Sequence, residues 1–190
     1  MKSCHAGAIG ILLLLFCQAC ERPDVRFPRF SRDRIIVWGI LEEVEELFAQ
    51  NVSGQPAGAV DATADCPGGG SVHITGTLDA TGNSSDLLYD LDGCAFDKAS
   101  TEGTVMVSLT LTGRIDQDIA IDAAGYGSVE LDSESLKMQG WEFNQPEEAD
   151  VDLECPFSAT QAVSSISGAI MGKVCGRDTT WTYYHESCTR

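Results

Sequence analysis

The histidines are the side chains best suited to general acid–base chemistry in this chain. His73 and His185 are the two that follow residues 1–20. A Ser-His-Asp site assembles in space and not in sequence, so either histidine could belong to one. The chain contains neither a G-x-S-x-G turn nor an H-E-x-x-H zinc motif. The sequence therefore predicts no catalytic residues and no enzyme, with a secreted soluble hydrolase as an alternative.

Closely spaced carboxylates in Asp90-Leu-Asp-Gly93, followed by Asp97 and Glu102, suggest a calcium loop. An EF-hand loop has oxygen ligands at its first, third and fifth positions and glycine at its sixth. Here the fifth position is Cys94 and the glycine is fourth. The interpretation that we adopt is a solvated turn, with no metal ion and no cofactor.

The first twenty residues have the organisation of an export signal. Lys2 gives a positive start, and residues 9–16 form a short apolar run. A run of this length is far below the roughly 20 residues that a membrane-spanning helix needs. A charged start, a short apolar core and a small residue before the cut are the parts of a secretory signal peptide.

Two kinds of cleavage fit the end of this signal. Ordinary signal peptidase would use Cys17 and Ala19 as the small residues before the cut. Alternatively, Ala19 followed by Cys20 resembles the lipobox of bacterial lipoproteins, although that family usually has Leu where this chain has Cys17. By the same resemblance, Glu21 after the cysteine implies sorting to the outer membrane. We favour lipid attachment at Cys20.

The remaining cysteines can oxidise in an exported compartment. Cys66 and Cys94 bracket one predicted hairpin, so we expect a disulfide between them, stabilising by roughly 3 kcal/mol. Among the last three cysteines we prefer Cys155–Cys175, which leaves Cys188 unpaired. Without a C-x-x-C pair, zinc is a poor alternative. If Cys20 carries lipid, the number of cysteines left to form disulfides is odd, so one of them stays unpaired. If Cys20 carries no lipid, the number is even and every cysteine could pair.

Charge divides the chain into a basic arm and an acidic remainder. The formal net charge is −17, which argues against nucleic acid as a partner. Residues 21–32 contain two prolines, so this segment should be extended. Its arginines, with Phe27 and Phe30, could contact anionic lipid headgroups, or the segment could be a solvated tether. The arginines of the arm are Arg22, Arg26, Arg29, Arg32 and Arg34.

Residues 33–50 form the one helix that the sequence predicts clearly. Asp33 can cap its start. Val37, Leu41, Val44 and Phe48 recur at spacings of three and four, which is typical of a helix packed on a core. The same periodicity puts four glutamates on the far, solvated side: Glu42, Glu43, Glu45 and Glu46.

Beyond the helix the periodicity changes from helical to alternating. We expect a loop over 51–70. Residues 103–115 alternate most regularly between apolar and polar, as in an antiparallel sheet with one wet face. Segment 162–175 fits a helix or a strand, and we choose strand because glycine costs a helix interior about 1 kcal/mol. The predicted strands are 71–78, 87–91, 103–115, 118–122, 128–132, 136–143, 151–157, 162–175 and 179–185.

A family resemblance covers roughly residues 66–176. A cysteine before a glycine run (Cys66-Pro-Gly-Gly-Gly70), a cysteine closing the next strand (Tyr89 to Cys94), the 103–113 strand and a later Cys175-Gly176 occur in this order. This series resembles a group of uncharacterised all-β secreted lipoproteins of Gram-negative bacteria. The resemblance implies fold and location, and it carries no activity.

These observations predict one all-β domain with one N-terminal helix. We expect an antiparallel meander of about seven to nine strands forming a sandwich or an open half-barrel. The parts are a signal peptide (1–20), a basic extended tether (21–32) and the β-rich domain (33–190). The expected function is a non-enzymatic binding or structural role in an exported protein, attached through Cys20 to the periplasmic face of the outer membrane. Without lipid the protein would be periplasmic or secreted. A periplasmic carrier of an apolar ligand is the second hypothesis, beside the hydrolase.

Overall fold

One helix and eight strands make up the part of the chain that the computed structural model describes, residues 32–79, 84–99, 105–122, 126–144, 147–163 and 167–184. Every strand pairs antiparallel with the next, so the sheet has the order of the sequence. The predicted fold class is confirmed. The elements are α1 (Arg32–Asn51), β1 (Gly58–Asp65), β2 (Ser71–Leu78), β3 (Ser84–Ala99), β4 (Val105–Ile121), β5 (Gly127–Asn144), β6 (Glu147–Val163), β7 (Ser167–Val174) and β8 (Arg177–Tyr184).

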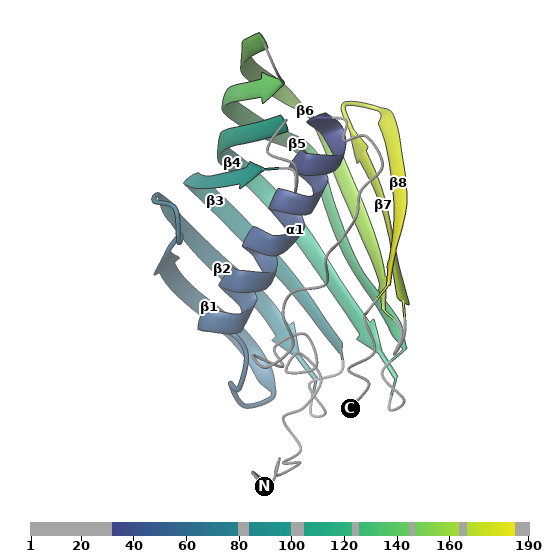
Figure 1. Ribbon diagram of the computed structural model, residues 1–190. Helices are drawn as coiled ribbons and strands as arrows, with labels where there is room; N and C mark the ends of the chain where they lie inside the picture. Colours follow the sequence, from purple (N-terminus) through teal and green to yellow (C-terminus); the bar gives the residue numbers. More distant parts are fainter. Residues whose placement is uncertain are drawn as a thin grey trace, which may run out of the picture.

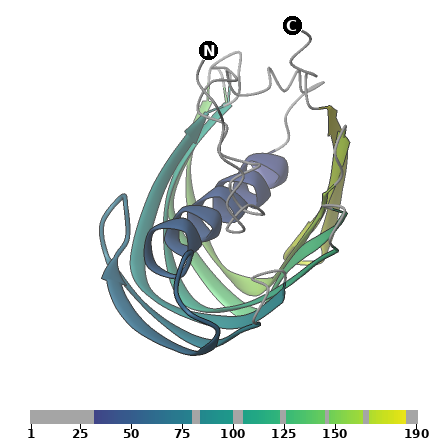
Figure 2. The same ribbon diagram turned by 90° about the horizontal axis from the view of Figure 1, so that it is seen from below.

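The sheet is strongly curved, and α1 lies in its trough (Figures 1 and 2). The view along the trough in Figure 2 shows the strands bending around the helix on both sides. β1 and β8 are the two edges and do not pair with each other, so the sheet stays open. Of the two predicted architectures, the structure is the open half-barrel.

Two irregularities in strand pairing accompany this curvature. In β3, Gly93 (φ 70°) is an extra residue between the pairs Asp92–Thr112 and Cys94–Leu111. In β5, the stretch between Ser133 and Leu136 has one residue more than the facing stretches of β4 and β6. Such β-bulges bend a strand and increase its twist.

Two strands were each predicted as two pieces, one of them because of a bulge and the other at polar residues that continue the alternation in phase. Segments 103–115 and 118–122 are one strand, β4, and segments 128–132 and 136–143 are one strand, β5. In β5 the buried positions move from Leu131 and Ser133 to Leu136 and Met138, so the alternation changes phase. A phase change looks like a strand end in the sequence, although the pairing continues through it. The choice of strand over helix for 162–175 is confirmed, although residues 162–163 end β6 and β7 covers 167–174.

The predicted loop at 51–70 was wrong, because β1 lies within it. Its sequence, GAVDATAD, is small and acidic, and such residues have weak strand preference. Only Val60 of β1 is fully buried. Pairing with β2 over eight residue pairs, and not side-chain preference, makes this segment a strand.

The helix approaches the sheet closely at two glycines. A Cβ on Gly172 of β7 would lie 2.6 Å from Val37 Cγ2, and a Cβ on Gly39 would collide with the Phe96 ring of β3. The apolar face of α1 is completely buried, with Ile36, Val37, Ile40 and Leu47 each at 0% exposure. These side chains and the inward side chains of the strands form one hydrophobic core.

One part of the helix prediction was wrong. Glu43 was expected on the solvated side, but it is only 5% exposed. The reason is the trough: a helix on a flat sheet buries one stripe, whereas a helix in a curved sheet is covered on its flanks as well. Asp33 lies inside the first turn and not before it, since α1 begins at Arg32.

Candidate functional site

Two cysteine pairs lie at disulfide distance, and they are the two pairings expected from the sequence. Cys66 and Cys94 have Cα atoms 5.4 Å apart and are almost fully buried. This pair joins the β1–β2 turn to β3. Cys155 and Cys175, 5.1 Å apart between Cα atoms, join β6 to the β7–β8 turn. Cys20 and Cys188 lie outside the described residues.

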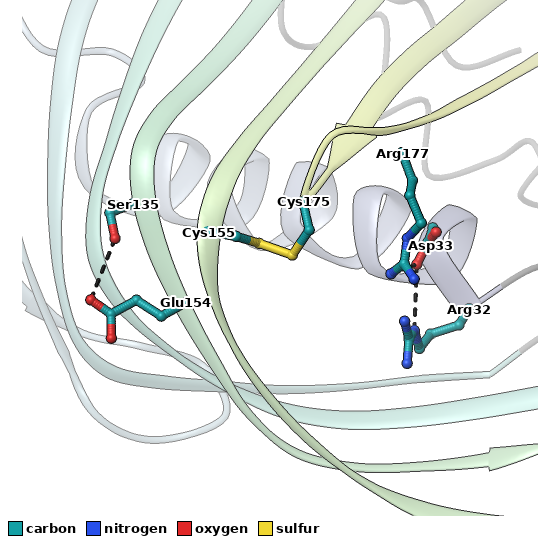
Figure 3. Close-up of a disulfide and its surroundings, with 7 residues drawn as sticks. All are labelled: Arg32, Asp33, Ser135, Glu154, Cys155, Cys175 and Arg177. Atoms are coloured by element: carbon teal, nitrogen blue, oxygen red, sulfur yellow. Dashed lines mark hydrogen bonds and ion pairs between the residues drawn. A yellow bond between two sulfur atoms is a disulfide. The ribbon is translucent and has the colours of Figure 1, made fainter.

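The turn that carries Cys175 also carries Arg177, which reaches the first turn of α1 (Figure 3). Cys175 adopts a left-handed conformation (φ 51°), and its N–H donates to the Pro156 carbonyl at 3.1 Å. Two residues on, Arg177 Nη2 donates to Asp33 Oδ1 at 3.0 Å. The disulfide therefore holds the turn that carries an ion pair to the helix.

Arg34 fastens the helix to β8. Its Nε donates to Thr179 Oγ1 at 3.3 Å, and its Nη2 donates to the Thr180 carbonyl at 3.0 Å. The guanidinium lies 6.0 Å from the centre of the Trp181 ring, within the range of a cation–π contact. Arg32, close by, is 3.4 Å from Glu142 Oε2 of β5. Two arginines assigned to the basic arm thus hold the helix in the trough.

His73 has a carboxylate partner, but the pair is open to solvent. Its Nε2 lies 2.8 Å from Asp61 Oδ1 on the neighbouring strand β1. The side chains are 49% and 82% exposed. A general base needs a substrate proton within hydrogen-bond reach and a site that holds the substrate. This imidazole–carboxylate pair supplies a base and its partner on the open face of two strands, and both stay in contact with solvent. His185 lies outside the described residues.

The segment Asp90–Gly93 is not the solvated turn that was expected. It belongs to β3, and Gly93 is the bulge described above. Asp90 Oδ2 lies 3.5 Å from Arg114 Nε on β4. Across the described ranges, no three or more His, Cys, Asp or Glu side chains converge in a geometry that could hold a metal ion.

Glu43 is a buried carboxyl that sequence reasoning missed. Burial, together with the charge of Glu46, raises its pKa to about 7, while Lys98 of β3 acts in the opposite direction. Lys98 Nζ forms its ion pair with Glu42. Glu43 Oε1 has no hydrogen-bond partner among the described residues. The carboxyl therefore changes charge near neutral pH at the contact between α1 and β3.

A polar group also lies within the concave face. Tyr89 Oη donates to Gln117 Oε1 at 2.9 Å, and both side chains are buried. Burial raises the pKa of the Tyr89 phenol. The hydroxyls of Ser85 and Ser133 are buried without a hydrogen-bond partner in the described part of the chain. The sequence offered one signal, because Gln117 stands in phase between Ile115 and Ile119.

The convex face carries most of the negative charge. Asp118 of β4 lies directly opposite Asp86 of β3 and Glu130 of β5, and Asp116 lies opposite Asp132. We call these five residues the acidic ladder. Partial burial and the charges of Glu130, Asp116 and Asp118 raise the pKa of Asp132. Like charges directly opposite each other destabilise a sheet.

Comparison of the chain with protein-family models, with curated proteins and with solved structures finds no match in any of the three. The resemblance to secreted lipoproteins therefore stays a prediction. Among the described residues, no helix is both long enough and apolar enough to cross a membrane.

Proposed function

We propose that this chain is an exported cell-envelope protein, anchored by lipid on Cys20 to the periplasmic face of the outer membrane, with a non-enzymatic binding role. The observation that carries the proposal is the presence of two cysteine pairs at disulfide distance. Structural disulfides are rare in reducing compartments and common in exported proteins. The pairs thus agree with the export signal that residues 1–20 predict.

The pairing leaves Cys20 available for lipid. From residue 20 onward the chain has six cysteines, and the two pairs use four of them. Cys20 and Cys188 are left, so neither pair in the domain needs Cys20. The competing possibility is a Cys20–Cys188 disulfide, which would leave the protein without its anchor.

The binding role rests on the convex face. The acidic ladder keeps carboxylates opposite one another on three neighbouring strands. Folding gains nothing from this arrangement, because facing like charges lower stability. Such a face attracts a partner of opposite charge from a distance, and the ladder alone does not fix where on the face that partner docks.

The carrier alternative would use the concave face. An apolar ligand there needs a cavity between helix and sheet. Ile40 and Leu47 of α1 are fully buried in the same core as the strand side chains, and Val37 lies against Gly172. A carrier would therefore have to release α1 before binding, and this requirement places it second. The hydrolase alternative has His73 and Asp61, which are exposed.

Intact mass of the protein isolated from membranes tests the proposal. We expect a mature chain that starts at Cys20 and carries a diacylglycerol adduct, in the outer-membrane fraction. Cys20→Ser should abolish the adduct and release the protein from the membrane, whereas Cys188→Ser, the matched control, should leave both unchanged. An unmodified Cys20 bonded to Cys188 would remove the anchor, and a chain that retains residues 1–20 would overturn export itself.

A further inference from the structure

Three apolar side chains lie together on the convex face, where β4 begins and β5 ends, in the strand ends that rise to the top of Figure 1. Met106 lies directly opposite Phe143, and Trp141 projects from the same side of β5 two residues earlier. Met106 is 37% exposed, Trp141 is 36% exposed and Phe143 is half-buried. We call these three residues the Trp141 patch. An exposed apolar cluster with a polar rim marks a site of interaction.

Carboxylates flank this patch on both neighbouring strands. In the row of cross-strand neighbours that contains Trp141, Asp97 of β3 stands at one end and Asp150 of β6 at the other. Glu148 of β6 lies directly opposite Phe143. All three carboxylates are exposed, and none forms an ion pair with another described residue. Their charges are therefore available to a partner.

We propose that the Trp141 patch binds a basic polypeptide segment. An arginine or lysine lies over the Trp141 ring, and neighbouring basic side chains pair with Asp97, Glu148 and Asp150. An aromatic face attracts a cation, most strongly for tryptophan, and arginine also stacks on it. The protein already uses this contact once, since Arg34 lies over Trp181. This inference rests on the proposed binding role and names the chemistry of its partner.

The remaining convex face provides a matched comparison. The acidic ladder has five carboxylates and the rim of the patch has three, but the ladder includes no aromatic residue. Diffuse attraction would make the two regions equivalent toward a cationic peptide. If the site is built around Trp141, loss of carboxylates at the patch weakens binding more than loss of carboxylates in the ladder. Two carboxylates can be neutralised in each region: Asp97 and Asp150 at the patch, Asp86 and Asp118 in the ladder.

The test titrates the exported protein, purified as the cell makes it, with a hexa-arginine peptide at about 0.1 M ionic strength, followed by calorimetry. We expect saturable binding with one site. Trp141→Ala should weaken it about tenfold, and Trp141→Phe less, since a phenyl ring binds cations more weakly. Asp97→Asn with Asp150→Asn should weaken binding several-fold. Asp86→Asn with Asp118→Asn should change it less than about twofold, because exposed charges beyond a Debye length of about 10 Å are largely screened.

Several outcomes would overturn the inference. Equal losses at the patch and at the ladder would show diffuse attraction, and unchanged binding by both Trp141 variants would remove the aromatic contact. Equal binding of a hexaglutamate peptide would remove the charge preference. If the protein alone is a dimer that Trp141→Ala dissociates, the patch contacts a second copy of the chain. The proposed anchor is tested separately, because the mass of the mature protein does not depend on whether the patch binds a peptide.

Discussion

The concave and convex faces of this sheet are built from alternate residues of the same strands, yet one face is buried and the other is exposed to solvent. Along β4, Val107, Leu109 and Leu111 are buried on the concave side, and Met106 and Thr110 are exposed on the convex side. The concave face is determined by packing around α1. The convex face packs against nothing in the described part of the chain, and some of its carboxylates, among them Asp97, Glu148 and Asp150, form no ion pair with another described residue. The comparison locates stability on the concave face, and our proposal places recognition on the convex one.

The largest expected effect is a difference between adjacent residues of β4. Leu111→Ala, in the fully buried concave core, should lower the free energy of unfolding by about 2–5 kcal/mol, since it removes apolar contacts and leaves a cavity. Thr110→Ala, its exposed neighbour, should change stability by less than about 0.5 kcal/mol. Urea unfolding of both variants measures the difference. Equal losses at the two positions would mean that the convex face is also packed.

An intermediate effect is expected at Glu43, a buried carboxyl on the concave side. Its pKa is raised to about 7, so between the ordinary pKa of a glutamate and pH 7 the folded protein holds a proton that the unfolded chain has lost. Stability should therefore fall as the pH rises through this window. Above pH 7 the folded protein bears the full cost of a buried, charged Glu43. Glu43→Gln should stabilise the protein at about pH 8 by the order of 1–3 kcal/mol and have little effect at about pH 5.

Unfolding midpoints of this variant and of the parent protein across the same pH range supply the measurement. Glu148→Gln, an exposed carboxyl of the convex face, is the control, and its difference from the parent should not vary with pH in this way. A constant difference between Glu43→Gln and its parent at all pH values would mean that Glu43 stays charged in the folded protein.

The boundary between the two faces was predictable from the sequence, and the curvature of the sheet was not. Alternation in 103–115 gave the buried and exposed sides of β4, and Cys66 and Cys94 were expected to pair because they bracket one hairpin. These features are local. Glu43 was misplaced because its burial depends on how far the sheet bends around α1. That bend coincides with bulges, which in sequence resemble strand ends.

The Trp141 patch was harder to predict for a related reason. Trp141, Met106 and Phe143 are ordinary residues of alternating strands, and their grouping depends on the register between β4 and β5. The flanking carboxylates come from β3 and β6, so four strands must be paired before the arrangement exists. Residues 1–31 and 185–190, with Cys20 and His185, lie outside the described residues, so their predictions stay predictions.

The smallest expected effect distinguishes a convex face that costs stability from one that is neutral. Asp118 faces Asp86 and Glu130 at once, so Asp118→Asn removes two repulsive pairs. The variant should be more stable by about 0.2–1 kcal/mol. The gain should shrink in about 1 M salt, where the Debye length falls to about 3 Å.

Asp178→Asn is the control, because Asp178 Oδ1 is paired with Lys173 Nζ at 3.2 Å, and loss of this carboxylate should not stabilise the protein. Urea midpoints at low and high salt provide the measurement. A stabilised Asp118→Asn protein would show that folding is opposed by this face, whereas a destabilised one would mean that the ladder contributes to the fold and that its carboxylates need no partner to explain them.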